Sequence, residues 1–412
     1  MSKLDELIQQ YCPDGVKYKK LGELGKFFGG LTGKSKDDFT DGNAKFITYK
    51  NVYANPALQI DVEDRVKIAD GEKQRTLQYG DIVFTGSSET PDECGISSVV
   101  TMKTDEQLYL NSFCFFFRFD DSSIMLPDFA KHLFRSSDLR YQIGKTASGV
   151  TRFNVSKKLM EKVTVPLPPL EVQSEIVRIL DNFTELTAEL TAELTARKKQ
   201  YEYYRDKLLT FDSKIPFVKL GDFCDLLTGY PFDSTQFVDN GIRLMRGMNI
   251  KRGILEFNDG IDRYWKSSNG LERFLLQDKD IVISMDGSLV GKSYGYVQED
   301  DLPLLLVQRV TRIRTEKANI RYVYHCIASG TFTSYVEKKK TGGAIPHISL
   351  KDISNFAIPL PEVEVQNRIV NVLDNFDAIC SDLKNGLPAE IEARQKQYEY
   401  YRDKLLRFEK VI

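Results

Sequence analysis

The sequence has few of the residues that bind metals or form covalent cross-links. Its 412 residues include three histidines and six cysteines. The histidines, His132, His325 and His347, do not form a cluster with zinc-ligand spacing, and no two cysteines form a Cys-x-x-Cys pair. In a long chain this cysteine usage is typical of reduced core residues in a cytoplasmic protein. We therefore expect a cytoplasmic location, no metal and no cofactor in this chain.

Long apolar runs and net charge are also lacking. No run of about 18 consecutive apolar residues exists, so we expect no membrane span. The first residues, Met1 to Glu6, lack the apolar stretch of a signal peptide. The formal net charge is −2. Proteins that bind DNA alone are usually basic. The charge therefore counts against nucleic-acid binding, unless basic residues gather on one face and partners supply the rest.

Catalytic motifs are absent as well. A DNA methyltransferase needs an Asn or Asp before a Pro-Pro-aromatic run, and Pro166-Leu-Pro-Pro169 has only the prolines. The segment Gly287 to Ser293 is one residue too short between its glycines for a phosphate-binding loop. An ordinary glycine turn and a DNA-facing loop are the alternatives for it. The sequence predicts a protein that is not itself an enzyme.

What the chain does contain is a long-range repeat. The ten residues Gln200–Leu209 recur without change as Gln397–Leu406, 197 positions later. Leu180–Phe183 recurs as Leu373–Phe376 at an offset of 193. Four residues have thus been gained in the second copy between these two blocks. Self-similarity over such a distance indicates an internal duplication.

Each repeated segment has the apolar spacing of a coiled-coil helix. Apolar residues follow an alternating four–three pattern from Ile176 to Phe211, broken at Thr187 and Arg197. We expect one helix over Glu171–Phe211, roughly 60 Å long at 1.5 Å per residue. In the second copy, Asn385-Gly386 and Pro388 predict a break and a new helix opened by Pro388. Two matched helices most simply pack against each other as an antiparallel spacer, in a pseudo-twofold molecule.

The first helix also carries a short tandem repeat. Thr-Glu-Leu at Thr184 is followed by two Thr-Ala-Glu-Leu units and a final Thr-Ala that ends at Ala196. Each four-residue unit adds about 6 Å of helix. A helix whose length changes in such steps can set a distance.

Two diverged globular domains precede the two helical segments. Lys20-Leu-Gly22 matches Lys219-Leu-Gly221, and Asp81-Ile-Val83 matches Asp280-Ile-Val282. Short strand-like runs alternate with turn residues, which predicts an α+β fold. The expected strands are 45–49, 82–84 and 112–117, and the expected helices are 3–11, 127–143 and 320–338. The expected division is an N-terminal segment 1–16, a first domain 17–165, a first helical region 166–214, a second domain 215–358 and a second helical region 359–412.

At this point the residues resemble a known family, the specificity (S) subunits of type I restriction-modification systems. The resemblance is carried by Pro166-Leu-Pro-Pro-Leu-Glu-Val-Gln173 running into a long helix, by its second copy at Pro359 to Gln366, and by the Thr-Ala-Glu-Leu units. The second copy departs from the first at Glu362, where the first has Pro169. The resemblance covers nearly the whole chain.

The resemblance implies a function and a set of partners. Each globular domain would be a target recognition domain that reads one half of a bipartite, asymmetric site in double-stranded DNA. The helices would set the gap between the halves and dock two methyltransferase (M) subunits. Restriction (R) subunits would complete an ATP-dependent nuclease that serves phage defence, and DNA methylation would come from the M subunits. The S subunit would carry no catalytic residue.

Candidate DNA contacts are basic and amide residues beside flexible glycines or after apolar runs. Such side chains suit phosphates and base edges, although solvated charge is the alternative at each position. The candidates are Lys34, Lys36, Lys50, Asn51, Lys145, Arg152 and Asn154 in the first domain, and Arg246, Asn249, Lys251, Lys292, Arg309, Lys340 and His347 in the second.

The repeated tyrosines have two predicted roles. Tyr201 and Tyr204 lie on the four–three seam, so we expect them in the protein core or an interface rather than stacked on bases. Tyr203 and Tyr400 lie off the seam and are candidates for contact with M subunits. A coiled-coil adaptor that binds proteins and no DNA is the alternative function, and the net charge of −2 favours it slightly.

Overall fold

A computed structural model describes residues 2–343, 345–381 and 386–411. The chain divides into two compact units. The first unit contains residues 1–188 with 392–412, and the second contains residues 189–391. Helix α7, Leu170–Leu208, begins in the first unit and ends in the second, and the first unit combines two separate segments of the sequence.

Two sheets form the body of the first unit. The larger antiparallel sheet has the order β2-β10-β6-β8, made of Gly25–Gly29, Cys114–Phe119, Ile82–Thr85 and Ser97–Val99. The other has the order β4-β3-β9-β5, made of Arg65–Val66, Ala44–Ile47, Leu108–Leu110 and Thr76–Leu77. Alternating β-branched and aromatic residues put Ile82, Phe84, Phe115 and Phe117 into one core and Val83 and Phe116 into another.

The second unit repeats this plan. Its larger sheet has the order β15-β21-β18-β19, made of Asp225–Thr228, Val310–Arg314, Ile281–Ser284 and Tyr294–Tyr296. The other has the order β17-β16-β20, made of Tyr264–Trp265, Ile242–Met245 and Leu304–Leu306. In both units the smaller sheet contains one parallel pair, β3 with β9 and β16 with β20. The two domains are therefore diverged copies of one α+β fold.

Each domain also contains a matched pair of short strands and several short helices. The strand pair β1–β13, Tyr18–Lys20 with Thr164–Pro166, corresponds to β14–β22, Phe217–Lys219 with Ala357–Pro359. The first unit also holds α1 Lys3–Tyr11, α2 Leu21–Leu24, α3 Tyr49–Ala54, α6 Lys157–Met160 and a 3-10 turn at Lys36–Phe39. The second holds α8 Leu220–Phe223, α11 Leu350–Ser354 and 3-10 turns at 234–236, 247–249, 272–274 and 299–301.

The long helices largely confirm the repeat analysis. Helix α7 has 39 residues and ends three residues before the expected Phe211. The second copy forms α12, Val363–Ser381, and α13, Leu387–Leu405. Pro388 is the second residue of α13, as expected for a new helix start. Leu383 of the seam, and Asn385 of the expected break, lie outside the described residues.

Two expected helices are each broken in two. The stretch 127–143 forms α4 Pro127–Leu133 and α5 Ser137–Gly144, and 320–338 forms α9 Ile320–Ala328 and α10 Gly330–Lys339. The breaks fall at the matched Ser136 and Ser329, whose backbones are extended. Their hydroxyls donate to the carbonyls of Leu133 at 2.7 Å and Cys326 at 2.6 Å. Serine competes well for backbone groups, which favours a helix end over a helix interior.

The expected strand at 45–49 is also too long. Strand β3 ends at Ile47, and Tyr49 is the first residue of α3. The hydroxyl of Thr48 accepts from the N–H of Asn51 at 3.3 Å, so Thr48 caps this helix.

A buried histidine ties the first domain to the helices of its unit. His132 of α4 lies with Nε2 2.8 Å from Asp181 Oδ1 of α7 and Nδ1 2.9 Å from the hydroxyl of Tyr398 of α13. Burial lowers the pKa of His132, outweighing the opposite effect of Asp181. The ring is therefore neutral near pH 7. A carboxylate can only accept, so Nε2–H donates to Asp181 and the Tyr398 hydroxyl donates to Nδ1.

The second unit has the same arrangement. His325 of α9 lies with Nε2 2.7 Å from Asp374 Oδ1 of α12 and Nδ1 2.9 Å from the hydroxyl of Tyr201 of α7. Burial lowers the pKa of His325 as well. In both units the tyrosine belongs to the repeat that follows the other domain in sequence. We call these two sets of residues the His–Asp–Tyr contacts.

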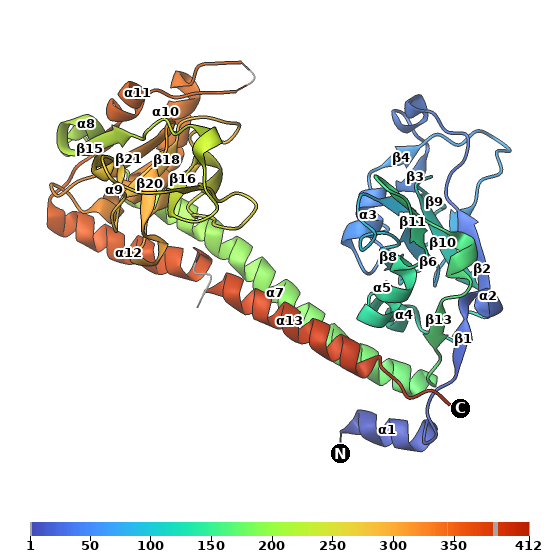
Figure 1. Cartoon of the computed structure of the whole chain (residues 1–412). Helices are drawn as coiled ribbons and strands as arrows, with labels where there is room; N and C mark the ends of the chain where they lie inside the picture. The colour runs from blue at the N-terminus through green and yellow to red at the C-terminus, as the bar shows by residue number, and fades with distance from the viewer. Residues whose placement is uncertain (1, 344, 382–385, 412) are drawn as a thin grey trace. The chain divides into compact units, whose positions relative to one another are not determined.

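The helices pack on each other beside these contacts. Phe183 stacks on Tyr401 at 5.3 Å between ring centres, and Phe376 stacks on Tyr204 at 5.6 Å. In the first unit the end of α13 runs beside the beginning of α7 (Figure 1). Tyr201 packs against the core of the second unit and Tyr398 against that of the first. The expectation that the seam tyrosines serve packing is confirmed.

Among the described residues, none of the helices combines the length and apolar character needed to cross a membrane.

Candidate nucleic-acid interface

In both domains a segment far along the chain pairs with the residues that follow a central strand, as a β-hairpin in the first domain and through isolated β-bridges in the second. In the first domain, β7 Ser87–Ser88 follows β6 and pairs with β12, Phe153–Val155, which pairs with β11, Ala147–Ser148. The register places Ser87 opposite Asn154. In the second domain, Asp286 follows β18 and pairs with His347, which also pairs with Thr341. Several candidate residues meet at this junction, which we call the hairpin site.

The hairpin site of the first domain is a polar and aromatic cavity. Arg152 donates from Nε and Nη2 to the Ser87 hydroxyl, at 3.2 and 3.0 Å. Its guanidinium lies 5.5 Å from the centre of the Phe113 ring, which is 57% exposed. The cavity has a volume of about 630 Å³ and is also lined by Tyr49, Lys50, Tyr53, Glu93 and Thr151. A basic side chain beside exposed rings suits an extended polyanion with bases.

The hairpin site of the second domain is organised by one carboxylate. Asp286 accepts from Arg309 Nη1 at 2.8 Å and from His347 Nδ1. Arg309 has a backbone φ of 68°, the left-handed region that side chains other than glycine rarely adopt. Such conformations persist only where the surrounding structure imposes them. The loop at Gly287–Gly291 is next to this site, because the Gly287 N–H donates to the Pro346 carbonyl at 3.1 Å.

That glycine loop does not form a phosphate-binding loop. The N–H groups of Val290 and Lys292 donate to the carbonyls of Gly287 and Leu289 within the loop, at 3.1 and 2.8 Å. A strand, β19, follows it, whereas a phosphate loop opens a helix. Gly291 has a φ of 81°, and a Cβ there would lie 2.8 Å from Val336, so the glycine serves a tight turn.

Three candidate residues make hydrogen bonds or ion pairs inside their own domain, and their contacts with DNA remain predictions. Lys34 is 9% exposed, and its Nζ lies 2.6 Å from both Glu72 Oε2 and the Lys67 carbonyl. Asn51 bridges to the backbone of Gln59 at 2.8 and 3.2 Å. The matched Asn249 is fully buried and donates to the Glu256 carbonyl and Asp262. Both asparagines hold a loop in place.

The other candidates lie on the surface, and their DNA contacts remain predictions. Arg246 donates to the Ile261 carbonyl at 3.1 Å, and burial lowers its pKa. Lys340 pairs with Glu337 at 2.6 Å, and Lys251 lies 3.8 Å from Glu256. Exposed residues without such pairing to a carboxylate in the described structure are Lys36, Lys50, Lys145, Asn154 and Lys292.

Sequence reasoning missed three residues of the hairpin site, Ser87, Phe113 and Asp286. None is basic, so a search for cationic residues passes over them. Lining up the two domains could have found Ser87 and Asp286, because each lies six positions after the matched residue Asp81 or Asp280.

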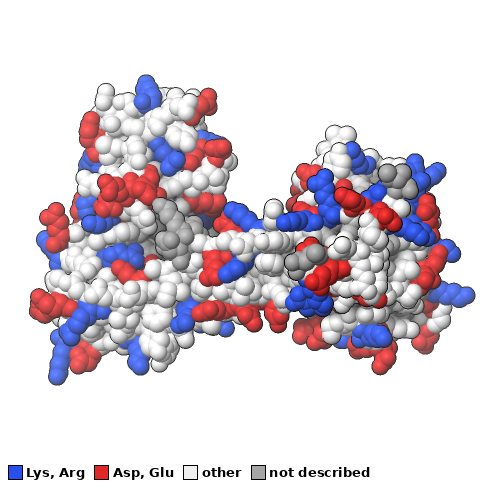
Figure 2. All heavy atoms as spheres, turned by 90° about the horizontal axis from the view of Figure 1, so that it is seen from below, with Lys and Arg blue, Asp and Glu red and all other residues white. Residues whose placement is uncertain are grey.

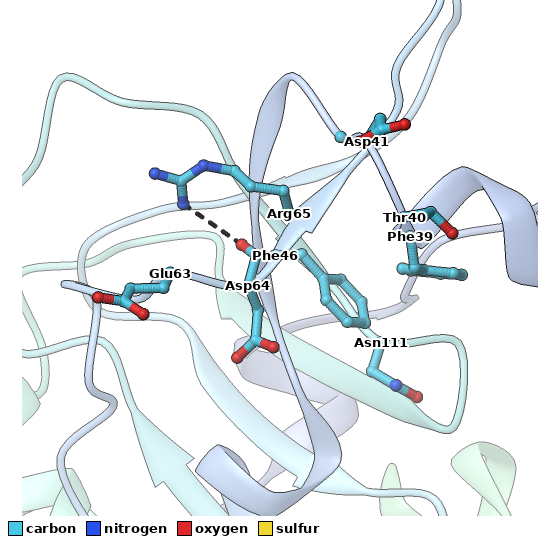
Figure 3. Close-up of a pocket in the computed structure, with 9 residues that line it drawn as sticks. Phe39, Thr40, Asp41, Phe46, Glu63, Asp64, Arg65 and Asn111 are labelled. Carbon is cyan, nitrogen blue, oxygen red and sulfur yellow. Dashed lines mark hydrogen bonds between the residues drawn. The ribbon is translucent and has the colours of Figure 1, made fainter.

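A larger cavity of the first unit is unsuited to a polyanion. It has a volume of about 750 Å³ and is lined by acidic Asp41, Glu63 and Asp64 (Figure 3). Its one basic residue, Arg65, donates to the carbonyls of Val62 and Asp64 at 2.8 and 3.3 Å. None of the candidate DNA residues lines it. Lys and Arg are interspersed with Asp and Glu on the face seen in Figure 2.

Comparison with known proteins shows which family the two repeated parts of the chain match. The family model for the type I restriction modification DNA specificity domain matches residues 13–197 and 213–393. The chain belongs to this family.

Two relatives are also named as type I specificity subunits. The specificity subunit of the type I restriction enzyme EcoR124I/EcoR124II from Escherichia coli is 38% identical over 268 residues, which cover 62% of this chain and 65% of the relative. A putative type I specificity subunit from Haemophilus influenzae, S.HindORF215P, is 31% identical, covering 63% of this chain and 68% of the relative. The alignment thus spans slightly less than two thirds of the E. coli protein.

Two solved structures share the fold of the specificity-domain family. The S subunit of a type I restriction-modification system from M. genitalium is 13% identical, with a TM-score of 0.52 and coverage of 95% of this chain and 96% of that chain. A chain from a study of complex assembly and conformational transition of the type I R-M system is 18% identical, with a TM-score of 0.62 and coverage of 96% and 98%.

The off-seam tyrosines are exposed alike in the two copies. Tyr203 and Tyr400 are each 61% exposed, and each packs edge-on against the next tyrosine at 5.3 and 5.2 Å. Tyr203 lines a shallow depression with Lys199, Glu202, Asp206, Lys207 and Thr210. Contact with an M subunit at these residues remains a prediction.

Proposed function

We propose that this chain is the DNA specificity subunit of a type I restriction-modification system, and that each domain reads one half of a bipartite DNA site. The observation that carries the proposal is the double match to the specificity-domain family, one match to each diverged copy of the fold. Two copies with a retained scaffold and different exposed side chains suit two different half-sites. The site read would therefore be asymmetric.

The subunit itself performs no chemistry in this proposal and holds no cofactor. The M subunits would transfer methyl groups, and the R subunits would cleave DNA with ATP. Two M subunits would match two equivalent docking faces, which carry Tyr203 and Tyr400. The helices α7, α12 and α13 would set the gap between the half-sites. The proposed location remains cytoplasmic.

The deciding experiment is single-molecule sequencing of modified bases in the host genome, with the gene intact and deleted. We expect one split, asymmetric motif to lose methylation on deletion and to regain it when the gene is restored. The same data give both half-sites and the gap. An unchanged methylome, in cells that express this chain and an M partner, would contradict the proposal and favour the protein-binding adaptor.

A further inference from the structure

The two domains keep the same scaffold around the hairpin site. In the first, Arg118 donates to both oxygens of Asp81, at 2.7 and 2.6 Å. In the second, Arg314 donates to both oxygens of the matched Asp280, at 2.6 and 2.7 Å. A bidentate ion pair retained at the same strand positions shows that the sheet geometry has been preserved through the divergence.

The backbone of the hairpin site is preserved as well. The Gly86 N–H donates to the Phe113 carbonyl at 2.7 Å, and the Met285 N–H donates to the Arg309 carbonyl at 2.9 Å. Ser87 faces Asn154 across the strand pair as Asp286 faces His347. Position 113 thus corresponds to 309, 87 to 286, and 154 to 347.

The side chains at these matched positions are nevertheless different in kind. Phenylalanine in one domain corresponds to arginine in the other, serine to aspartate, and asparagine to histidine. Random sequence divergence alone does not account for these replacements, because in each domain the new side chains contact one another. Arg152 is held by Ser87 beside Phe113, and Arg309 and His347 are both held by Asp286. The divergence here has produced two differently built polar sites on one frame.

We propose that these are the base-reading residues: Phe113, Arg152 and Asn154 for one half-site, and Arg309 and His347 for the other. Ser87 and Asp286 are positioning residues that orient them. This inference rests on the proposed function and deepens it, because it assigns the specificity of each half to named side chains at one matched site.

In the second domain, Arg309 suits the edge of a purine base, and His347 suits a base that donates a hydrogen bond. Arg309 is 59% exposed and uses one guanidinium N–H on Asp286. A guanidinium fixed in this way can give two parallel N–H donors to O6 and N7 of guanine. His347 Nδ1 must donate to the carboxylate, so in the neutral ring Nε2 is an acceptor. An acceptor there matches the amino group of cytosine or adenine.

In the first domain the chemistry is different. The exposed Phe113 ring suits the methyl group of thymine, and Asn154 can bond both edge atoms of adenine. Arg152 packs its guanidinium over the Phe113 ring and donates to the Ser87 hydroxyl, and these two contacts fix the guanidinium beside the ring. The cavity next to it brings Lys50 to the same place, where it can contact a phosphate.

The test uses the full complex with its M subunits and a library of duplexes in which each base pair of the methylated motif is changed in turn. Arg309→Ala is expected to lower the preference for the correct base by about 5- to 150-fold at one or two positions of one half-site. The other half-site and the gap should not change. Arg309→Lys keeps the charge and loses the paired donors, so it should relax the same positions. Arg152→Ala should relax positions in the other half-site only.

Matched controls remove exposed charges outside the hairpin site, Lys317→Ala in the second domain and Lys158→Ala in the first. They should leave base preference unchanged. Arg309 and Arg152 variants that bind all sequences equally weakly, or that behave like these controls, would overturn the assignment of base reading. A wild-type complex that shows no sequence preference at all would overturn the proposed function and this inference with it.

Discussion

At the scale of residues, the buried histidines explain why single tyrosines of the repeat matter. Tyr201 and Tyr203 stand two positions apart in the same ten-residue block, yet only Tyr201 reaches a buried polar group. Its hydroxyl donates to His325 Nδ1, and burial raises the pKa of Tyr201, so it stays a donor. A buried acceptor left without a donor destabilises a protein by about 1–3 kcal/mol.

Tyr201→Phe is therefore expected to lower the free energy of unfolding of the second unit by about 1–3 kcal/mol. The single tryptophan, Trp265, lies in this unit, so its fluorescence in a urea titration reports on it. Tyr203→Phe is the matched control and should change the value by less than about 0.5 kcal/mol, as surface substitutions usually do. Equal effects of the two variants would show that the His325 contact does not stabilise the unit.

The same histidine makes stability depend on pH. The folded pKa of His325 is lowered from its ordinary value of 6.5 because the ring is buried. Below pH 6.5 the unfolded chain therefore binds a proton that the folded chain does not. The free energy of unfolding should fall as the pH drops through 6.5 and be level above it. The lowered pKa of Asp374 acts at lower pH, around and below its ordinary value of 3.8.

Urea titrations of Trp265 fluorescence at several pH values test this expectation. The wild-type chain should lose stability between neutral pH and pH 5, and His325→Gln should show a shallower dependence. His132→Gln is the control, because His132 lies in the first unit whereas Trp265 lies in the second. A pH dependence that survives His325→Gln unchanged would assign it to other groups.

At the scale of elements, α7 and α13 each contain residues of both units, and α7 carries the tandem repeat. The tandem units Thr187–Leu190 and Thr191–Leu194 lie in its middle, at the boundary between the two units. Removing four residues shortens a helix by about 6 Å, which is close to the rise of two base pairs. The domains themselves keep all their own residues when this part of α7 is shortened.

Deleting Thr191–Leu194 should therefore shorten the gap of the methylated motif by about two base pairs and leave both half-sites unchanged. The check is modified-base sequencing of a strain that carries the shortened gene. A strain with Leu194→Ala, which keeps the length, serves as the control and should retain the original gap. A changed half-site with an unaltered gap would contradict the role of α7 as a spacer.

At the scale of the whole molecule, charge separates the alternatives for function. With 57 basic and 59 acidic residues, the chain is not an obvious DNA-binding protein by itself. DNA affinity that depends on phosphate contacts falls with salt in proportion to the number of contacts. If partners supply most of those contacts, the salt dependence belongs to the complex rather than to this chain.

Binding of a duplex with the methylated motif should therefore be weak for this chain alone and tight for the complex with M subunits. The plot of log affinity against log salt should be steeper for the complex. Fluorescence anisotropy at several salt concentrations measures both, with a scrambled duplex as control. Equal slopes for the chain and the complex would place the phosphate contacts on this chain instead.

The sequence by itself determined the duplication, the helical spacer and the α+β class. These follow from identity at a fixed offset and from local apolar period, both of which are written along the chain. It also predicted α1 to the residue and the new helix near Pro388, because capping and proline act locally. The helix breaks at Ser136 and Ser329 were missed, because helical apolar spacing continued through them.

Only the tertiary structure decided which residues meet. His132, Asp181 and Tyr398 are spread over 266 positions, and nothing local pairs the tyrosine of one repeat with the histidine of the other domain. The side-chain amides of Asn51 and Asn249 donate to the carbonyls of Gln59 and Glu256, and no local pattern indicates these bonds. Ser87 and Asp286 became important only when a distant hairpin paired with them. Long-range contacts depend on how the strands assemble, and a local sequence pattern does not contain this information.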